Sequence, residues 1–220
     1  MHKRIFSIKC FILNNKEGRM KRSLIFATLI ALGFYGCAGG ARYIDTSSTE
    51  YVSSSLDLND IKKASKESLE SLFRSGYYNK IDVNNPVVLA VSDFINDTTI
   101  KLDMEQITAR IVEELQNTGK FLITRAISGS GGSTDSMIDK SRQARDDEEY
   151  DQNSVVEKGE KLAVSASLSG KVGQRITRVG SDQRVDYFFK IEIVNTKNGI
   201  SVWSKTIDIS KISSGNSSVW

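Results

Sequence analysis

The chain has 220 residues, of which 39% are hydrophobic and 26% are charged, values that are ordinary for a soluble globular domain and exclude a disordered or polytopic chain. Its one histidine is His2 and its two cysteines are Cys10 and Cys37, so the sequence beyond residue 37 offers no Cys/His zinc site, no internal disulfide and no histidine-activated nucleophile. The net charge of +3 arises in the first 36 residues, which hold seven basic residues and one acidic residue. The other 184 residues hold 23 basic and 26 acidic residues, so they are mildly acidic. A mildly acidic domain argues against a nucleic-acid partner.

The start of the chain has the pattern of a secretory leader. Two basic residues, Lys21 and Arg22, precede a short apolar run that ends in Gly-Cys at Cys37. The run is too short to cross a bilayer, which takes roughly 20 apolar residues, so we expect residues 1–36 to be a signal peptide. Residues 1–19 precede a second methionine and are interpreted as an upstream extension, so that the true start is either the first or the second methionine.

The Gly-Cys pair at Cys37 resembles the lipobox of bacterial lipoproteins. This resemblance implies that the leader is cut before Cys37, that the cysteine carries acyl chains such as palmitate, and that Ala38 directs the protein to the outer membrane. The alternative is an ordinary secretory signal with a chance cysteine. Residues 37–56 then form the lipidated cysteine and a Ser/Thr/Gly-rich tether, which reaches roughly 65 Å when fully extended.

A globular domain is predicted over residues 57–212, followed by a tail of residues 213–220. It opens with an amphipathic helix that Asp57 can cap and that Gly76 ends in a left-handed conformation. A nearly continuous apolar run over 87–95 then predicts a central strand covered on both faces.

A second helix and a short strand follow a turn at residues 96–98. Asp103 and Gln106 form a capping-box-like pair, Gly119 ends the helix, and residues 120–126 return as a strand. The Gly/Ser-rich residues 128–136 predict a flexible loop, which lacks the Lys-Ser/Thr ending of a phosphate-binding loop.

The next segment, residues 139–160, is polar and is predicted to be a solvated helix. Its acidic run at 146–149 lacks the alternating spacing of a calcium loop, so we expect no metal site. The last third alternates apolar and polar residues in three strands, 164–176, 185–193 and 200–209, with a hairpin signal at Asn198-Gly199. The element order predicts one α/β layered domain whose mixed, partly antiparallel sheet is flanked by helices.

Little catalytic chemistry is available in this domain. Asp93 lies in an apolar strand and is a candidate for a perturbed pKa, but a structural role in a turn or a strand is the simpler interpretation. A carboxylate-based hydrolase lacks any motif, so we expect no enzyme, no catalytic residue, no cofactor and no small-molecule substrate. The aromatic residues Tyr187, Phe188, Phe189 and Trp203 are either core or an apolar docking patch.

Positive charge collects near one predicted hairpin end, at Arg175, Arg178 and Arg184. Residues 163–220 hold eight basic and four acidic residues. A mixed solvated surface is one explanation; our sharper hypothesis is that the three arginines form an electrostatic docking surface for a protein partner.

Four blocks of sequence together resemble a known family. They are Pro86–Thr98, Asp103–Phe121, Ala163–Val172 and Asn198–Trp203. In order and spacing they resemble the LpoB family of lipoproteins that activate penicillin-binding proteins, and the match covers about residues 55–212.

The resemblance implies a fold like the N-terminal domain of TolB and an outer-membrane lipoprotein that faces the periplasm. It implies that the protein binds a bifunctional penicillin-binding protein, a peptidoglycan synthase, and activates it allosterically. The tether here is shorter and poorer in proline than is usual in the family. The alternative is a curli-type secretion lipoprotein of the same fold, which would need membrane-spanning hairpins; residues 128–160 are too polar for one.

Overall fold

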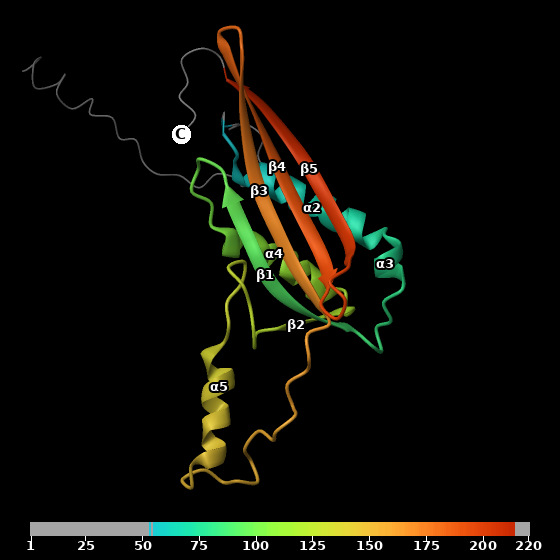
Figure 1. Cartoon of the computed structure of the whole chain (residues 1–220), viewed down its shortest axis with the longest axis vertical. Coiled ribbons are helices and arrows are strands. Elements are labelled where there is room, and N and C mark those ends of the chain that lie inside the picture. The colour runs from blue at the N-terminus through green and yellow to red at the C-terminus, as the bar shows by residue number, and fades with distance from the viewer. Residues whose placement is uncertain (1–52, 54, 214–220) are drawn as a thin grey trace, which may run out of the picture. The chain divides into compact units, whose positions relative to one another are not determined.

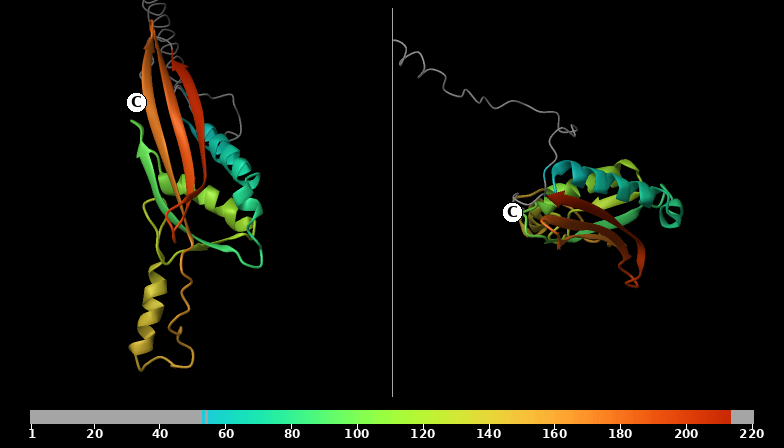
Figure 2. Two further views of the ribbon diagram at one scale, coloured as in Figure 1. Left: turned by 45° about the vertical axis from the view of Figure 1, so that its right-hand side comes forward. Right: turned by 90° about the horizontal axis from the view of Figure 1, so that it is seen from above.

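The computed structural model describes residue 53 and residues 55–213, which form a five-stranded sheet with two long helices packed on one face (Figures 1 and 2). The predicted signal peptide, Cys37, most of the tether and the tail beyond residue 213 lie outside the described residues. The elements are α2 (Leu58–Phe73), α3 (Gly76–Asn79), β1 (Val87–Asp97), α4 (Met104–Asn117), β2 (Phe121–Thr124), α5 (Ser136–Gln143), a 3-10 turn (Ala144–Asp146), β3 (Ala166–Val179), β4 (Asp182–Asn195) and β5 (Ser201–Ser213).

The sheet is mixed, with the strand order β2-β1-β3-β4-β5. β1 pairs in parallel with both β2 and β3, whereas β3, β4 and β5 form an antiparallel meander. This confirms the predicted α/β class. The prediction that both faces of β1 are covered is correct only for the first half of the strand. Leu89 and Ala90 are buried there, whereas Ile95 in the second half is 53% exposed.

Helix α2 begins with a complete capping box. The Asp57 carboxylate accepts hydrogen bonds from the backbone N–H groups of Asn59 and Asp60, and the Asp60 side chain accepts one from the backbone N–H of Asp57. The predicted role of Gly76 is wrong: α2 ends at Phe73, and Gly76 is the first residue of α3 without a positive φ. The Ser75 hydroxyl accepts a hydrogen bond from the backbone N–H of Tyr78 and caps α3. The boundary between α2 and α3 is therefore made by a side-chain cap and not by a left-handed glycine.

Helix α4 follows its prediction closely. Asp103 accepts a hydrogen bond from the backbone N–H of Gln106 at 3.1 Å, and Gly119 has a φ of 69° just beyond the helix. The buried stripe of α4 packs towards β1 and β2, and it consists of Met104, Ile107, Thr108, Ile111, Val112 and Leu115.

The Gly-rich segment is predicted to be a flexible loop, but in the structure it is held against β1. β2 ends at Thr124, and beyond it the backbone N–H groups of Gly129 and Gly131 donate to the carbonyl groups of Val91 and Ser92. The loop therefore satisfies the edge of β1 that the short β2 leaves unpaired. It meets β1 at a bulge, since three residue steps from Val91 to Phe94 face two steps on β3.

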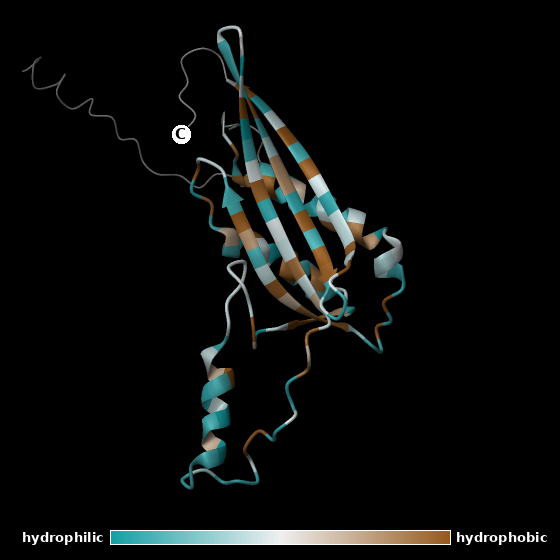
Figure 3. Cartoon of the chain, viewed as in Figure 1, coloured by the Kyte–Doolittle hydropathy of each residue, from teal (hydrophilic) through white to brown (hydrophobic). Residues whose placement is uncertain are grey.

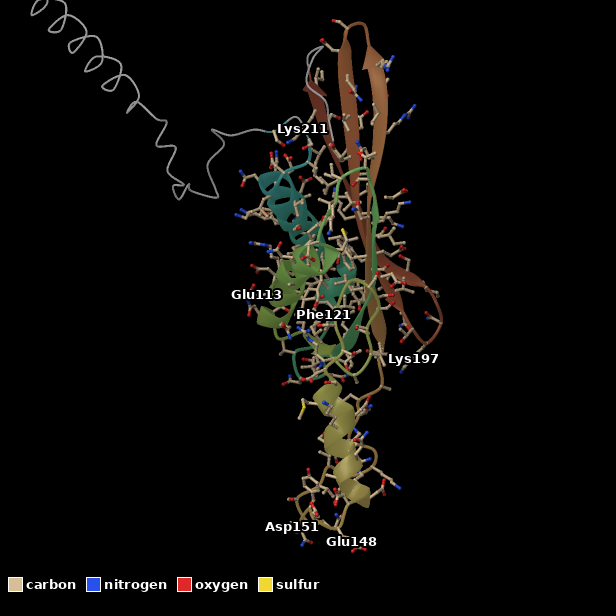
Figure 4. All side chains as sticks on the ribbon, turned by 90° about the vertical axis from the view of Figure 1, so that its left-hand side faces the viewer. Glu113, Phe121, Glu148, Asp151, Lys197 and Lys211 are labelled. Atoms are coloured by element: carbon tan, nitrogen blue, oxygen red, sulfur yellow. The ribbon has the colours of Figure 1, made fainter. Side chains whose placement is uncertain are left out.

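The polar segment is helical only in part. α5 ends at Gln143 and the 3-10 turn ends at Asp146; residues 147–165 contain no helix or strand. The predicted long helix over 139–160 is therefore wrong. Figure 1 shows the segment from α5 to the start of β3 projecting beyond the end of the sheet at which β1 begins. In Figure 4, Glu148 and Asp151 lie at the far end of this segment.

The core lies between the sheet and the two long helices. Alternate residues of β4, from Val185 to Ile193, are buried against the helices, and the alternation is visible along the strands in Figure 3. The β3–β4 hairpin is longer than predicted and extends beyond the helices, so Ile176, predicted to be buried, is 46% exposed. Gly199 has a φ of 70° in the β4–β5 loop, as its hairpin signal predicts.

Candidate partner-binding surface

The sheet face opposite α2 and α4, called the open face below, is formed by alternate residues of the strands. On β4 the residues between the buried ones, from Arg184 to Glu192, point to this face. Antiparallel pairing places β3 residues 171, 173 and 175 and β5 residues 206, 208 and 210 beside them. The open face is thus a broad, slightly curved surface of strands (Figure 2).

The charges of the open face are largely arranged in pairs. The three ion pairs are Lys171–Asp97 (2.6 Å), Arg184–Asp186 (2.8 Å) and Lys190–Glu192 (2.9 Å). Hydrogen bonds from the Ser210 hydroxyl and from Arg184 hold the pKa of Asp186 below its ordinary value. Such exposed pairs contribute little to stability. Recognition of a complementary surface therefore explains their ordered arrangement better than a stabilising role does.

An apolar spot lies among these pairs. Phe188 is 37% exposed on the open face and faces Gly173 across the strand pair, and Ile95 lies on the same face of β1. Gly173 has no side chain to cover the phenyl ring, so the ring remains accessible. An exposed aromatic residue surrounded by paired charges has the composition of a protein-interface hot spot.

The aromatic residues predicted as core or patch divide between the two roles. Tyr187 and Phe189 are buried against the helices and are core, as their strand positions predict. Phe188 is on the open face. Trp203 is half-buried and packs against the core from β5.

The three arginines predicted as one docking surface do not share a face. Arg175 lies opposite Asp186 and therefore on the open face with Arg184, whereas Arg178 lies opposite Gln183 and points to the other side of the hairpin. The sequence brings them close along the hairpin, but the two-residue period of a strand separates Arg178 from the other two.

Asp93 is an exposed structural residue. Its carboxylate accepts a hydrogen bond from the backbone N–H of Ser130 at 2.8 Å, and this bond lowers the pKa of Asp93. A carboxylate with a lowered pKa is a poor proton acceptor at neutral pH. The arrangement supports the structural interpretation, in which Asp93 helps to fix the Gly-rich loop on the β1 bulge.

The turn after β1 is held differently from its prediction. Asn96 donates to the carbonyl of Ile100 and accepts from Thr98, so these two side chains make the turn. Asp97, the middle residue of the predicted turn, instead forms the ion pair with Lys171. In residue 53 and residues 55–213, no group of three metal-ligating side chains comes together, and no helix there has the length and hydrophobicity to cross a bilayer.

Sequence reasoning missed Lys211, which joins the start of the domain to β5. Its ammonium group donates to the carbonyl groups of Ser53 and Ser55, at 3.2 and 2.8 Å, and forms ion pairs with Asp57 at 3.0 Å and with Asp60. Figure 4 shows Lys211 beside the first turn of α2. The strand predicted over 200–209 stops short of Lys211, although its alternation, continued by two residues, places this lysine on the buried side, where an ammonium group needs a partner.

Comparisons with known proteins found one sequence family and several similar solved structures. A sequence model of the family "Peptidoglycan-synthase activator LpoB" matches residues 60–209, while no curated protein sequence matches the chain. Similar solved structures include the LpoB C-terminal domains of Salmonella enterica (13% identity, TM-score 0.39, covering 68% of this chain and 98% of that one) and Escherichia coli (16%, 0.39, 69% and 99%). Another is the lipoprotein GNA1162 of Neisseria meningitidis (14%, 0.32, 61% and 88%).

The family model covers well over half of the chain and includes α4, strands β1 to β4, most of β5 and nearly all of α2. The chain therefore belongs to the LpoB family of peptidoglycan-synthase activators.

Proposed function

We propose that this chain is an outer-membrane lipoprotein, anchored through Cys37 and facing the periplasm, that binds a bifunctional penicillin-binding protein and activates it allosterically. The observation that carries the proposal is the family match over residues 60–209. Activation requires only that the chain bind the active state of the synthase more tightly than the inactive state. The chain itself performs no catalysis in this proposal and needs no cofactor, nucleic acid or small-molecule substrate.

The docking surface in this proposal is the open face near Arg175 and Arg184. Phe188 and Ile95 supply exposed apolar area, and the surrounding ion pairs supply an ordered charge pattern. Arg178, included in the sequence-based hypothesis, lies on the other side of the hairpin and would contribute only if the partner also gripped the hairpin end.

The test is stimulation of a purified bifunctional penicillin-binding protein by the purified full chain, followed as glycan polymerisation and as peptide crosslinking. The double variant Arg175→Glu/Arg184→Glu and the variant Phe188→Ser should lower the affinity for the synthase at least tenfold, since each removes part of the proposed contact. Arg178→Glu is the matched control for charge reversal in the same hairpin.

Each part of the proposal has its own contrary result. Undiminished binding by both open-face variants removes the docking surface, and a failure of the parent chain to stimulate any synthase removes the activator function. Pull-down of secretion components, or self-assembly of the chain into rings, would favour the secretion-lipoprotein alternative.

A further inference from the structure

The end of the β3–β4 hairpin is covered only in part on the side that faces the helices. The register places Ile176, Val185 and Lys211 in one row across β3, β4 and β5. Val185 is fully buried and the Lys211 side chain is 10% exposed, whereas Ile176 is 46% exposed. Among the described residues, the covering of this row therefore stops before it reaches β3.

A positive charge lies beside the uncovered isoleucine. Arg178 is two residues further along β3 towards the hairpin tip, so it points to the same side of the sheet as Ile176. It is exposed, and it forms no ion pair with any residue that the structure describes. Ile176 and Arg178, called the hairpin patch below, thus present an apolar side chain and an unpaired guanidinium group.

The chain that leads into α2 passes the same row of the sheet. Lys211 donates to the carbonyl oxygens of Ser53 and Ser55, at 3.2 and 2.8 Å, and Figure 4 shows Lys211 beside the first turn of α2. The residues before Ser53 therefore start their path at β5 in this row. Two strand spacings, about 10 Å, separate β5 from β3, and about three extended residues span that distance.

The sequence of these preceding residues complements the hairpin patch. Counted back from the first described residue, Val52 and Tyr51 are apolar and Glu50 is acidic. On β3 the order is the same, because the apolar Ile176 comes before the basic Arg178 towards the hairpin tip. Both the length of this segment and its charge therefore fit the patch.

We propose that residues 50–52 of this chain, which lie outside the described residues, dock on the hairpin patch. Tyr51 packs on Ile176, and the Glu50 carboxylate pairs with the Arg178 guanidinium group. The occupant is the chain's own tether because the position of Ser53 places this segment within reach of the patch at all times. The apolar contact supplies most of the attraction, since an exposed ion pair contributes little.

Docking shortens the part of the tether that is free to extend. Residues 38–56 reach roughly 65 Å when fully stretched, whereas residues 38–49 reach only about 40 Å. Release of the segment from the patch therefore lengthens the reach of the folded body by about 25 Å. This consequence for the reach rests on the proposed anchor at Cys37, whereas the docking itself does not.

The first test is carbodiimide crosslinking of the purified full chain, a reaction that joins a carboxylate to an adjacent lysine amine. Arg178→Lys supplies the amine and keeps the positive charge. We expect a crosslink between Glu50 and position 178 within one chain, identified by mass spectrometry of the digest. Arg175→Lys is the matched control, because Arg175 lies on the open face of the same strand, and it should form no crosslink to Glu50.

The second test is the rate of chymotrypsin cleavage after Tyr51, which follows the fraction of chains whose segment is released. Arg178→Glu should raise the rate about threefold, the effect of a weak exposed pair, and Ile176→Ser should raise it about fivefold by removing the apolar contact. Ile212→Ser, which changes an exposed isoleucine on the open face, should leave the rate unchanged. The charge swap Glu50→Arg/Arg178→Glu should be cleaved more slowly than Glu50→Arg alone.

The inference is overturned if Glu50 crosslinks to neither position or equally to both, or if the Ile176 and Ile212 variants are cleaved at the same rate. A crosslink that joins two chains would assign the hairpin patch to a second copy and would also overturn it. Synthase stimulation and palmitate labelling are measured on the same preparations. Because neither depends on the docked segment, failure of the docking leaves the proposed function standing.

Discussion

Lys211 shows how one side chain can fix the beginning of a domain. Its side chain is 10% exposed, and it connects β5 to the backbone before α2 and to both carboxylates of the α2 capping box. A largely buried ammonium group with two carboxylate partners is costly to disrupt from either side. A mechanical force applied to the chain before Leu56 is therefore transmitted to β5 as well as to α2.

We expect Lys211→Met to lower the free energy of unfolding by about 2 kcal/mol, because it leaves two partly buried carboxylates without their cation. The measurement is urea denaturation of the purified chain at neutral pH. Lys205→Met is the control, since Lys205 occupies the same strand and face and forms no ion pair with any residue that the structure describes. Equal stability of the two variants would contradict a structural role for the Lys211 cluster.

The same cluster predicts a pH dependence with a definite sign. Burial alone would raise the pKa of Asp57, but hydrogen bonds from the Asp60 N–H and from Lys211 hold it below its ordinary value of 3.8. The stabilisation is therefore full well above pH 3.8 and is lost as the pH falls through the lower pKa of the folded state. For Lys211, burial lowers the pKa but Asp60 and Asp57 raise it above 10.5, so its contribution is full below that value and is lost as the pH rises further.

We expect acid denaturation followed by circular dichroism to be less steep in Lys211→Met than in the parent chain, because the variant loses part of the stabilisation of the ionised Asp57. Lys205→Met should retain the parent profile. An unchanged acid limb in Lys211→Met would show that the lysine does not stabilise that carboxylate.

At the scale of elements, the Gly-rich loop acts as a substitute for the missing end of β2. Gly129 and Gly131 approach β1 so closely that a Cβ atom on Gly129 would lie 2.6 Å from the carbonyl carbon of Ser92, and one on Gly131 would lie 2.8 Å from the carbonyl oxygen of Ser92. Neither glycine has a positive φ. The glycines are therefore needed for close approach and not for a turn, which is the reverse of the usual expectation for a Gly/Ser loop.

Gly129→Ala should destabilise the chain by about 2 kcal/mol, because the backbone must shift to accept the methyl group. Gly76→Ala should be neutral or slightly stabilising, since a Cβ there meets nothing within 4 Å and alanine favours a helix. Thermal denaturation of the two variants checks the contrast, and hydrogen exchange should show faster opening of β1 only in Gly129→Ala. If both alanine variants melt together, the loop does not pack against β1.

At the scale of the whole molecule, the proposed anchor and the folded body have separable roles. We expect Cys37→Ser to abolish metabolic labelling with palmitate and to release the protein from the membrane fraction, since no other thiol follows the leader. Stimulation of the synthase in solution should remain, because the domain does not depend on the anchor. Cys10→Ser, within the leader, should keep both the label and the membrane location. Retained labelling in Cys37→Ser would place the lipid elsewhere.

The candidate site was predictable only in part. Local pattern identified the strand that holds Arg175 and the aromatic run that contains Phe188, whereas Arg184 lies one residue before the strand predicted over 185–193. The register between β3 and β4 was needed to place Arg184 beside Arg175, and the extension of β3 to Val179 puts Arg178 on the other face through the two-residue period of the strand.

The sequence by itself determined the α/β class, the caps at Asp57 and Asp103, the alternating core of β4 and the family, because each of these depends on residues close together in the chain or on a pattern of fixed period. Only the tertiary structure decided that the Gly-rich loop is held on β1, that Lys211 joins the domain start to β5, that the polar segment is mostly irregular, and that the open face exposes Phe188. These features depend on pairing between segments far apart in sequence, where packing and backbone hydrogen bonds override local propensity.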